Sequence, residues 1–141
     1  MVLDSIFAII YDQLNRALNA EMKESERVEL VKSTVKEALL GCCYDWKTRS
    51  KWASYKVTDD MLRGYARMLI GVSVKFRAND MLSESICEDI LGYATRMRNV
   101  ADEPKHQDSE IGYVKETGEI FVGLDRMYKN FDRLFEDSII E

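Results

Sequence analysis

The segment TDDMLRGYARMLIGVSVKF, residues 58–76, has the clearest helical pattern in the chain. Its apolar side chains recur at three- and four-residue steps, which places them on one side of a helix. The members of this stripe are Met61, Tyr65, Met68, Leu69, Val72 and Phe76. Thr58 stands before two carboxylates, a pattern typical of a helix start, because a hydroxyl caps free amides and negative charge favours the positive end of the helix dipole. The segment therefore predicts an amphipathic helix that begins near Thr58.

The segments on either side predict two more helices. One apolar face of residues 24–43 holds Val28, Val31, Val35, Ala38 or Leu39, and Cys42. A similar face of residues 85–97 holds Ile86, Ile90, Tyr93 and Met97. Ser25 is the expected cap of the earlier helix, and Ser85 with Glu88 forms the expected capping box of the later one. The break before residue 85 is short, so the helices that flank it should pack as antiparallel neighbours.

The two ends of the chain are also helical in pattern, but a segment near residue 115 differs. The first stripe holds Leu3, Ile6, Ile10, Leu14, Ala17 and Leu18, and the last, within residues 124–140, holds Leu124, Met127, Phe131, Leu134 and Phe135. Residues 111–114 and 120–122 are short apolar runs that flank KETGE, residues 115–119. Two such runs around a glycine favour a β-hairpin that turns near Thr117 and Gly118.

The predicted fold is mainly α. We expect a single bundle-like domain over residues 1–141, with five helices and a small β-hairpin at about residues 111–123 inserted before the C-terminal helix. A lone two-stranded hairpin is marginal in water, so it must pack on the helices or on another subunit. The wide apolar faces of the helices favour a homo-oligomer.

Composition and charge exclude several classes of protein. The chain has 141 residues, 46% of them hydrophobic and 32% charged, as in an ordinary globular domain. No apolar run approaches the roughly 18 residues of a membrane helix, and Asp4 interrupts the apolar N-terminus, so neither a membrane span nor a signal peptide is expected. The net charge is −5, and residues 100–141 carry five basic and eleven acidic residues. A uniformly basic nucleic-acid binder is therefore excluded, although a local basic patch is not.

The chain has three cysteines, Cys42, Cys43 and Cys87. The count is odd, and two adjacent cysteines on a helix point about 100° apart, so a disulfide framework is not expected. Their places within apolar stripes indicate small buried side chains in a reducing compartment. We therefore expect a cytoplasmic protein.

Enzyme motifs are absent from the sequence. It contains no G-x-G-x-x-G, G-x-x-x-x-G-K-[ST], H-E-x-x-H or G-x-S-x-G pattern. His106, the single histidine, lies in a polar loop beside Asp108. A hard-metal site there, or a pair with Cys87, competes with the simpler interpretation of a solvated side chain, which we favour because metal ligands need rigid supports. We expect no metal and no cofactor.

Pairs of acidic residues one helical turn apart suggest a second kind of metal site. Glu26 and Glu29 form one such pair, and Glu84 or Ser85 with Glu88 forms the other. Helical nucleotide pyrophosphohydrolases hold Mg²⁺ with acidic pairs of this kind on two helices. Both pairs also lie early in their predicted helices, where acidic residues favour the helix dipole, and this explains them better.

The most informative segment is YDWKTRSKWASYK, residues 44–56. It holds both tryptophans, two tyrosines, four cations and one carboxylate. Trp, Tyr and Arg often dominate the energy of protein interfaces, while rings interleaved with cations also suit single-stranded nucleic acid. A structural role is the third interpretation, because six residues on a helix separate the two rings by about 120°, so one ring can be buried while the other is exposed. The candidate binding residues are Trp46, Lys47, Arg49, Lys51, Trp52, Tyr55, Arg63 and Arg67.

Three hypotheses about function follow. The leading one is a non-enzymatic cytoplasmic interaction module, an adaptor, inhibitor or assembly component, that binds a protein partner through residues 44–56. The second is nucleic-acid binding through the same segment, extended by Arg63 and Arg67 on the next helix. The third is a Mg²⁺-dependent nucleotide hydrolase that uses the acidic pairs.

Overall fold

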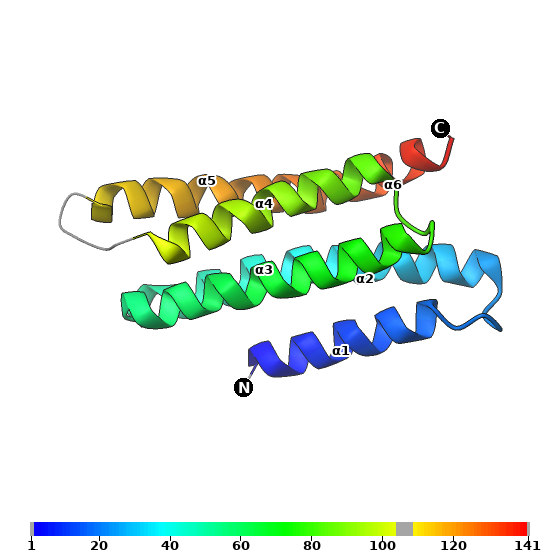
Figure 1. Cartoon of the computed structure of the whole chain (residues 1–141), viewed down its shortest axis with the longest axis horizontal. Helices are drawn as coiled ribbons and strands as arrows, with labels where there is room; N and C mark the ends of the chain where they lie inside the picture. Colours follow the sequence, from blue (N-terminus) through cyan, green and yellow to red (C-terminus); the bar gives the residue numbers. More distant parts are fainter. Residues whose placement is uncertain (1, 104–108, 141) are drawn as a thin grey trace.

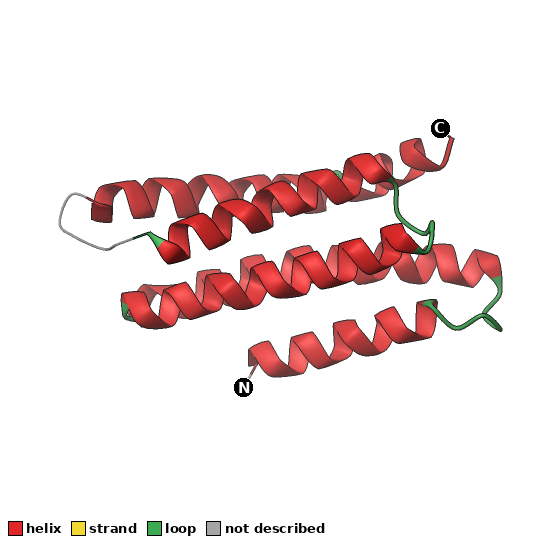
Figure 2. Ribbon diagram, in the orientation of Figure 1, coloured by secondary structure: helices red, strands yellow, loops and turns green. Residues whose placement is uncertain are grey.

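The computed structural model describes residues 2–103 and 109–140, without the side chains of residues 2–4, 109–111 and 139–140. Every element in these ranges is helical, and no strand occurs among them (Figure 1, Figure 2). The α-helices are α1 (Val2–Ala17), α2 (Glu24–Arg49), α3 (Tyr55–Ala78), α4 (Glu84–Asp102), α5 (Ser109–Lys129) and α6 (Phe131–Ile140), and a short 3₁₀ helix, η1 (Ser50–Trp52), joins α2 to α3.

Helix α3 runs through the middle of the molecule, with α4 packed along it (Figure 1). All six members of the predicted α3 stripe are buried, which confirms that amphipathic helix. The prediction that α3 and α4 are antiparallel neighbours is also confirmed. Helix α1 packs mainly against α2, and α5 packs against both α2 and α4. The α2–α3 connection therefore lies at the same end of the bundle as the end of α4 and the start of α5.

Helix α3 begins earlier than its sequence pattern predicts. Its N-cap is Ser54, whose Oγ accepts a hydrogen bond from the Val57 amide at 3.4 Å. Thr58 lies inside the first turns and is buried. Its Oγ1 accepts a hydrogen bond from the Tyr113 hydroxyl at 2.6 Å. The residue expected to cap α3 thus links α3 to α5 instead.

The predicted caps of α2 and α4 are wrong by a few residues. Ser83, not Ser85, caps α4, because its Oγ accepts from the Ile86 amide at 3.3 Å. Helix α2 begins after Lys23 with no side-chain cap, so Ser25 lies inside the helix. Arg27 in the first turn of α2 secures this end, since its Nε donates to the Ala17 carbonyl oxygen at the end of α1 at 2.9 Å.

The predicted β-hairpin at residues 111–123 is wrong, because these residues belong to α5. The inward face of α5 has a helical period. Its buried members are Tyr113, Thr117, Ile120, Leu124 and Met127. In contrast, Val114 and Val122, which the hairpin would have placed on its strands, are exposed on the helix.

Tertiary packing explains why this segment is helical. β-branched residues and glycines lower intrinsic helix propensity, but burial of one apolar face against neighbouring helices outweighs that preference. Within α5, the Thr117 hydroxyl donates to the Tyr113 carbonyl oxygen at 2.8 Å, so even this β-branched side chain is satisfied on a helix. The buried side chain of Ile120 then lies in the common hydrophobic core.

The residues of the predicted last helix, 124–140, are divided between the end of α5 and a separate helix, α6. Helix α5 ends at Lys129 and α6 starts at Phe131, with Asn130 between them. The Arg126 carbonyl oxygen accepts from both the backbone amide of Asn130, at 3.1 Å, and its side-chain amide, at 3.0 Å, which holds Asn130 at the end of α5. Among the residues that the structure describes, six α-helices therefore replace the five helices and the hairpin that were expected.

Two glycines of α5 meet very different surroundings. A Cβ added at Gly118 would have no heavy atom within 4 Å, whereas a Cβ added at Gly123 would lie 2.5 Å from Cε1 of Tyr93 on α4. At Gly123, then, the absence of a side chain lets the Tyr93 ring lie directly on the α5 backbone.

Replacing Gly118 with alanine should raise the free energy of unfolding by about 0.5–1 kcal/mol, because alanine loses less conformational entropy in a helix. Replacing Gly123 with alanine should instead lower the free energy of unfolding by about 1–3 kcal/mol, since the Tyr93 ring must move. Urea unfolding followed by circular dichroism measures both changes. A Gly118→Ala variant that is less stable than the wild type would indicate a turn at this position and contradict the helix.

Candidate binding surface

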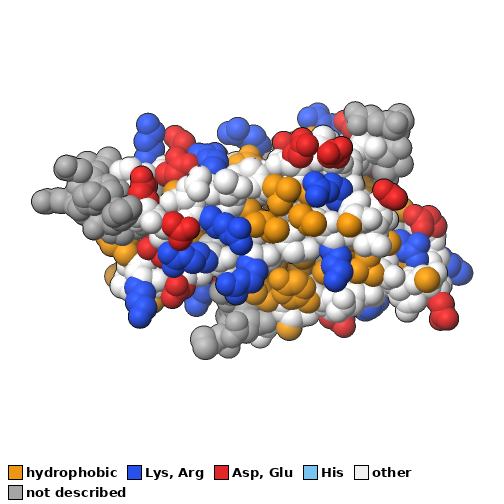
Figure 3. Space-filling model, in the orientation of Figure 1, with side chains coloured by type: hydrophobic (Ala, Val, Ile, Leu, Met, Phe, Trp, Pro, Cys, Tyr) orange, Lys and Arg blue, Asp and Glu red, His pale blue; other side chains and the backbone are white. Residues whose placement is uncertain are grey.

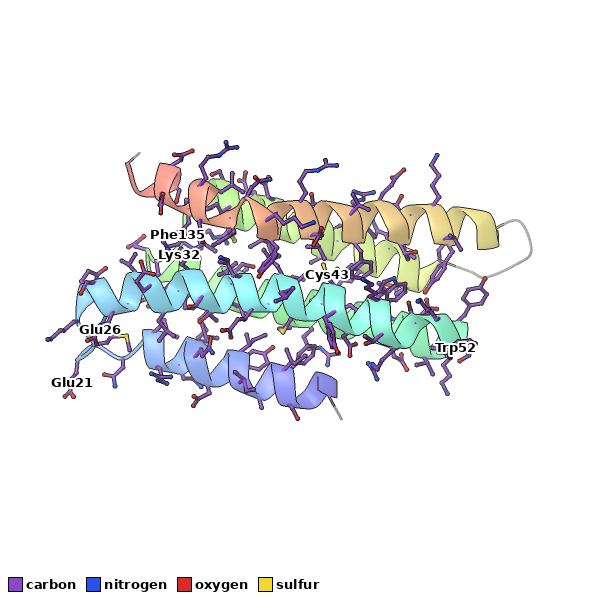
Figure 4. All side chains as sticks on the ribbon, turned by 180° about the vertical axis from the view of Figure 1, so that it is seen from behind. Glu21, Glu26, Lys32, Cys43, Trp52 and Phe135 are labelled. Atoms are coloured by element: carbon purple, nitrogen blue, oxygen red, sulfur yellow. The ribbon has the colours of Figure 1, made fainter. Side chains whose placement is uncertain are left out.

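The segment of residues 44–56 spans the last turns of α2, all of η1 and the first turn of α3. It does not form one continuous surface. Its side chains divide into an inward group around Trp46, an outer group on α2, and a group at the end of the bundle around Trp52, which is labelled in Figure 4.

Trp46 points into the bundle. Its ring stacks on Phe121 of α5, with the ring centroids 4.8 Å apart and the planes at 11°. The same Phe121 ring meets Tyr65 of α3 edge to face at 6.0 Å. Trp46 therefore joins α2 to α5 and is a packing residue.

A buried carboxylate lies beside this aromatic cluster. The Asp45 side chain is 1% exposed and accepts a hydrogen bond from the Tyr65 hydroxyl. Arg49, one turn along α2, places Nε 2.9 Å from Asp45 Oδ1 and donates from Nη2 to Oδ2 at 3.0 Å. The hydrogen bond to Asp45 raises the pKa of Arg49, and burial followed by the same carboxylate raises the pKa of Tyr65. Asp45, Arg49 and Tyr65 thus form a charged network that ties α2 to α3.

The Trp52 side chain is 90% exposed, more than any other large hydrophobic side chain among the residues described. It lies on η1, a short turn with several backbone anchors. The Ser50 hydroxyl donates to the Trp46 carbonyl oxygen at 2.6 Å, and the Ala53 amide donates to the Ser50 carbonyl oxygen at 3.3 Å. The turn is therefore firmly held while the Trp52 ring is in solvent.

Tyr55 begins α3 close to this turn. Its ring meets Tyr113 of α5 edge to face, with a centroid distance of 5.1 Å and an interplanar angle of 72°. Tyr55 is still partly accessible, at 38% exposure. Lys56, which follows Tyr55 directly, and Lys51, which precedes Trp52, are both exposed. These residues and Trp52 form the end surface, defined here as Lys51, Trp52, Tyr55 and Lys56.

The two arginines expected to extend the segment have different surroundings. Arg63 is bound to the end of α4, where its Nη2 donates to Asp102 Oδ1 and to the Ala101 carbonyl oxygen, each at 2.9 Å. Asp60 adds a second carboxylate, 3.3 Å from Arg63 Nη1. Arg67 is exposed and has no ion pair with any residue in the described ranges. In the view of Figure 3, acidic side chains are interspersed among the basic ones.

Sequence reasoning missed Asp45 and Tyr65 as a pair. The signal for Asp45 is its place on the same helical face as Ala38 and Cys42, which marks a carboxylate directed into the core. Nothing in the sequence indicates which hydroxyl it meets, because Tyr65 belongs to another helix.

The cysteines are free thiols. The prediction that they are buried is confirmed for Cys42 and Cys87, and Cys43 is partly buried, with its Sγ 3.8 Å from the Phe121 carbonyl oxygen. Burial raises the pKa of all three and takes that of Cys43 to about 12. At neutral pH they are therefore protonated thiols, which are weak nucleophiles.

The acidic pairs lie on exposed helix surface. Glu29 forms an ion pair with Lys32 at 3.3 Å, and Glu26, Glu84 and Glu88 are exposed. Within residues 2–103 and 109–140, no group of three or more His, Cys, Asp or Glu side chains is placed to hold a metal ion. His106 and Asp108 lie outside the described residues, so the structure does not address the predicted His106 loop.

No described helix is both long enough and apolar enough to cross a membrane. Comparison of the chain with protein-family models, with curated proteins and with solved structures finds no match.

Proposed function

We propose that this chain is a non-enzymatic interaction module whose end surface binds an acidic segment of a partner protein. The observation that carries the proposal is the 90% exposure of Trp52 on a firmly held turn between two long helices. An exposed tryptophan contributes nothing to core packing. Covered by a partner, it would remove a large apolar area from water.

The end surface has the properties of an interface anchor. Tryptophan is the residue type most enriched among positions that dominate protein-binding energy. Because hydrogen bonds already hold Ser50 and Ser54 on either side of the turn, little backbone order would have to be gained on binding. The fixed turn would therefore present the Trp52 ring at low entropic cost.

The charge around Trp52 favours an acidic partner. Lys51 and Lys56 are exposed, and neither forms an ion pair with another described residue. Lys47 lies one turn before Lys51 on α2 and is likewise exposed. A carboxylate-rich segment would be attracted to these ammonium groups, which raises the rate of association and disfavours basic partners.

Nucleic-acid binding is less well supported than protein binding. Successive bases need several free ring faces, but Trp46 is stacked on Phe121 and the Tyr55 ring is packed against Tyr113. Arg49 and Arg63 are held by carboxylates. This hypothesis and the Mg²⁺-dependent hydrolase remain predictions, as does the cytoplasmic location.

The test is a comparison of immobilised wild-type and Trp52→Ala chains in a cell extract, before and after nuclease treatment. Val122→Ala, which shortens an exposed apolar side chain on α5, is the matched control. We expect proteins that bind the wild type and the control but not Trp52→Ala. The purified partner should then lose about 100-fold in affinity for Trp52→Ala and about tenfold for Lys51→Glu.

Equal capture by the wild type and Trp52→Ala would refute the proposal. Titration with single-stranded DNA and RNA tests the competing class, because exposed Trp52 reports directly on a bound base. Saturable quenching of its fluorescence that salt reverses would replace the protein partner with a nucleic acid.

A further inference from the structure

A second exposed apolar surface lies on the outer side of α1 and α2, which are the blue and cyan helices in Figure 4. Three large apolar side chains are accessible here: Ile9 at 54%, Leu40 at 42% and Tyr44 at 58%. Between them is an open cavity of about 290 Å³. Its lining is apolar except for Glu37 and consists of Ile6, Ile9, Ile10, Glu37, Leu40, Gly41 and Tyr44.

The outer stripe of α2 has a symmetric pattern. It is formed by Glu37, Leu40, Tyr44 and Lys47, all exposed and all within about 80° around the helix axis. The apolar residues Leu40 and Tyr44 lie in the middle of the stripe. The negative charge of Glu37 lies at one end and the positive charge of Lys47 at the other. Residue 42 is the centre of this pattern, so reversal of the helix about that point exchanges Leu40 with Tyr44 and Glu37 with Lys47.

We infer that a second copy of this chain docks on the outer stripe with its α2 antiparallel, about a two-fold axis near residue 42. Leu40 then lies against Tyr44 of the second copy, and Glu37 lies opposite Lys47 of the second copy. Symmetry makes each contact occur twice, as in other isologous dimers. A parallel arrangement would set Glu37 against Glu37 and Lys47 against Lys47, which is repulsive at both ends.

Two contacts within one chain prepare the surface for this partner. Gln13 Nε2 donates to Glu37 Oε2 at 2.9 Å, which holds the carboxylate at the edge of the cavity. Gly41 lets α1 come close, since a Cβ there would lie 2.9 Å from Ile6 Cγ2. In the antiparallel register, the Tyr44 ring of the second copy lies beside the cavity at the level of Leu40. The dimer thus covers Leu40 and Tyr44, two of the large apolar side chains that the single chain exposes.

The experiment is light scattering combined with size-exclusion chromatography on the full chain, at chain concentrations from about 1 µM to 1 mM. We expect the wild type to reach twice the chain mass of 16.4 kDa. Glu37→Lys and Lys47→Glu should each weaken the dimer about tenfold or more, because each makes two attractive pairs repulsive. The double variant Glu37→Lys/Lys47→Glu restores both pairs in reversed order and should regain most of the wild-type affinity. Lys75→Glu, an exposed lysine on α3, is the charge-matched control and should behave as the wild type.

Leu40→Glu should weaken the dimer by about 100-fold, since it buries a charge at the centre of the interface twice. Circular dichroism checks that it folds, and the two charge variants test the proposal independently of that. Trp52→Ala should keep the dimer intact, so failure of the end surface and failure of this interface are distinguishable. A monomeric wild type at 1 mM, or a double variant no tighter than the single ones, would overturn the proposal.

Discussion

Replacing Asp45 with alanine is expected to lower the free energy of unfolding by about 3 kcal/mol, because the change dismantles a buried charged network. The variant leaves the Tyr65 hydroxyl without its acceptor and Arg49 without its carboxylate. Asp45 is 1% exposed and Tyr65 is fully buried, so little water is available to replace the hydrogen bond to the Tyr65 hydroxyl, whereas Arg49, 36% exposed, can be solvated. Urea unfolding monitored by circular dichroism at fixed pH measures the loss.

The matched control for Asp45→Ala is Asp60→Ala. Asp60 also pairs with an arginine, Arg63, but it lies on the surface, where such pairs contribute about 0–1 kcal/mol. Asp45→Asn gives an intermediate case, since its amide oxygen still accepts from Tyr65 while the negative charge is lost. If Asp45→Ala and Asp60→Ala unfold at the same urea concentration, the buried network does not stabilise the fold as inferred.

The second large effect is a difference in stability between variants of the two tryptophans. Trp46→Ala should lower the free energy of unfolding by about 2–3 kcal/mol, because it removes a ring stacked between α2 and α5. Trp52→Ala should change it by less than about 0.5 kcal/mol, since that ring is in solvent. Urea unfolding of the two variants side by side measures the difference.

Fluorescence provides a second measurement on the same pair of variants. Trp52→Ala leaves Trp46, whose emission should be shielded from a soluble quencher such as iodide. Trp46→Phe keeps an aromatic ring on Phe121 and leaves Trp52, which should be quenched as readily as free tryptophan. Equal quenching of the two would contradict the difference in exposure between Trp46, which is partly buried, and Trp52, which is exposed.

Local patterns in the sequence predicted those parts of the fold that depend on one helix at a time. The stripe from Met61 to Phe76 marks α3 because a buried helix face repeats with the helical period. The segment that contains Gly118 was misassigned because its β-branched residues and glycines have low helix propensity, and only contact with α2 and α4 makes it helical. Helix starts were displaced by a few residues because serine and threonine are frequent near each start, and local sequence does not select among them.

The candidate site was less predictable because its members are fixed by partners distant in the sequence. Composition indicated residues 44–56 as unusual, but the packing of Trp46 depends on Phe121, which follows 75 residues later. Arg63 is likewise engaged by Asp102 from another helix. The spacing of the two tryptophans allowed one to be buried and one exposed, yet it could not say which. Only the assembled bundle makes that distinction.

The contact between Tyr93 and Gly123 also has an evolutionary consequence. A chain of common descent can lose glycine at this place only if the aromatic ring on α4 becomes smaller or turns away. The two positions should therefore substitute together, thirty residues apart in the sequence. Such coupled replacement would mark distant relatives of this chain even where their surfaces, and the partners they bind, have diverged.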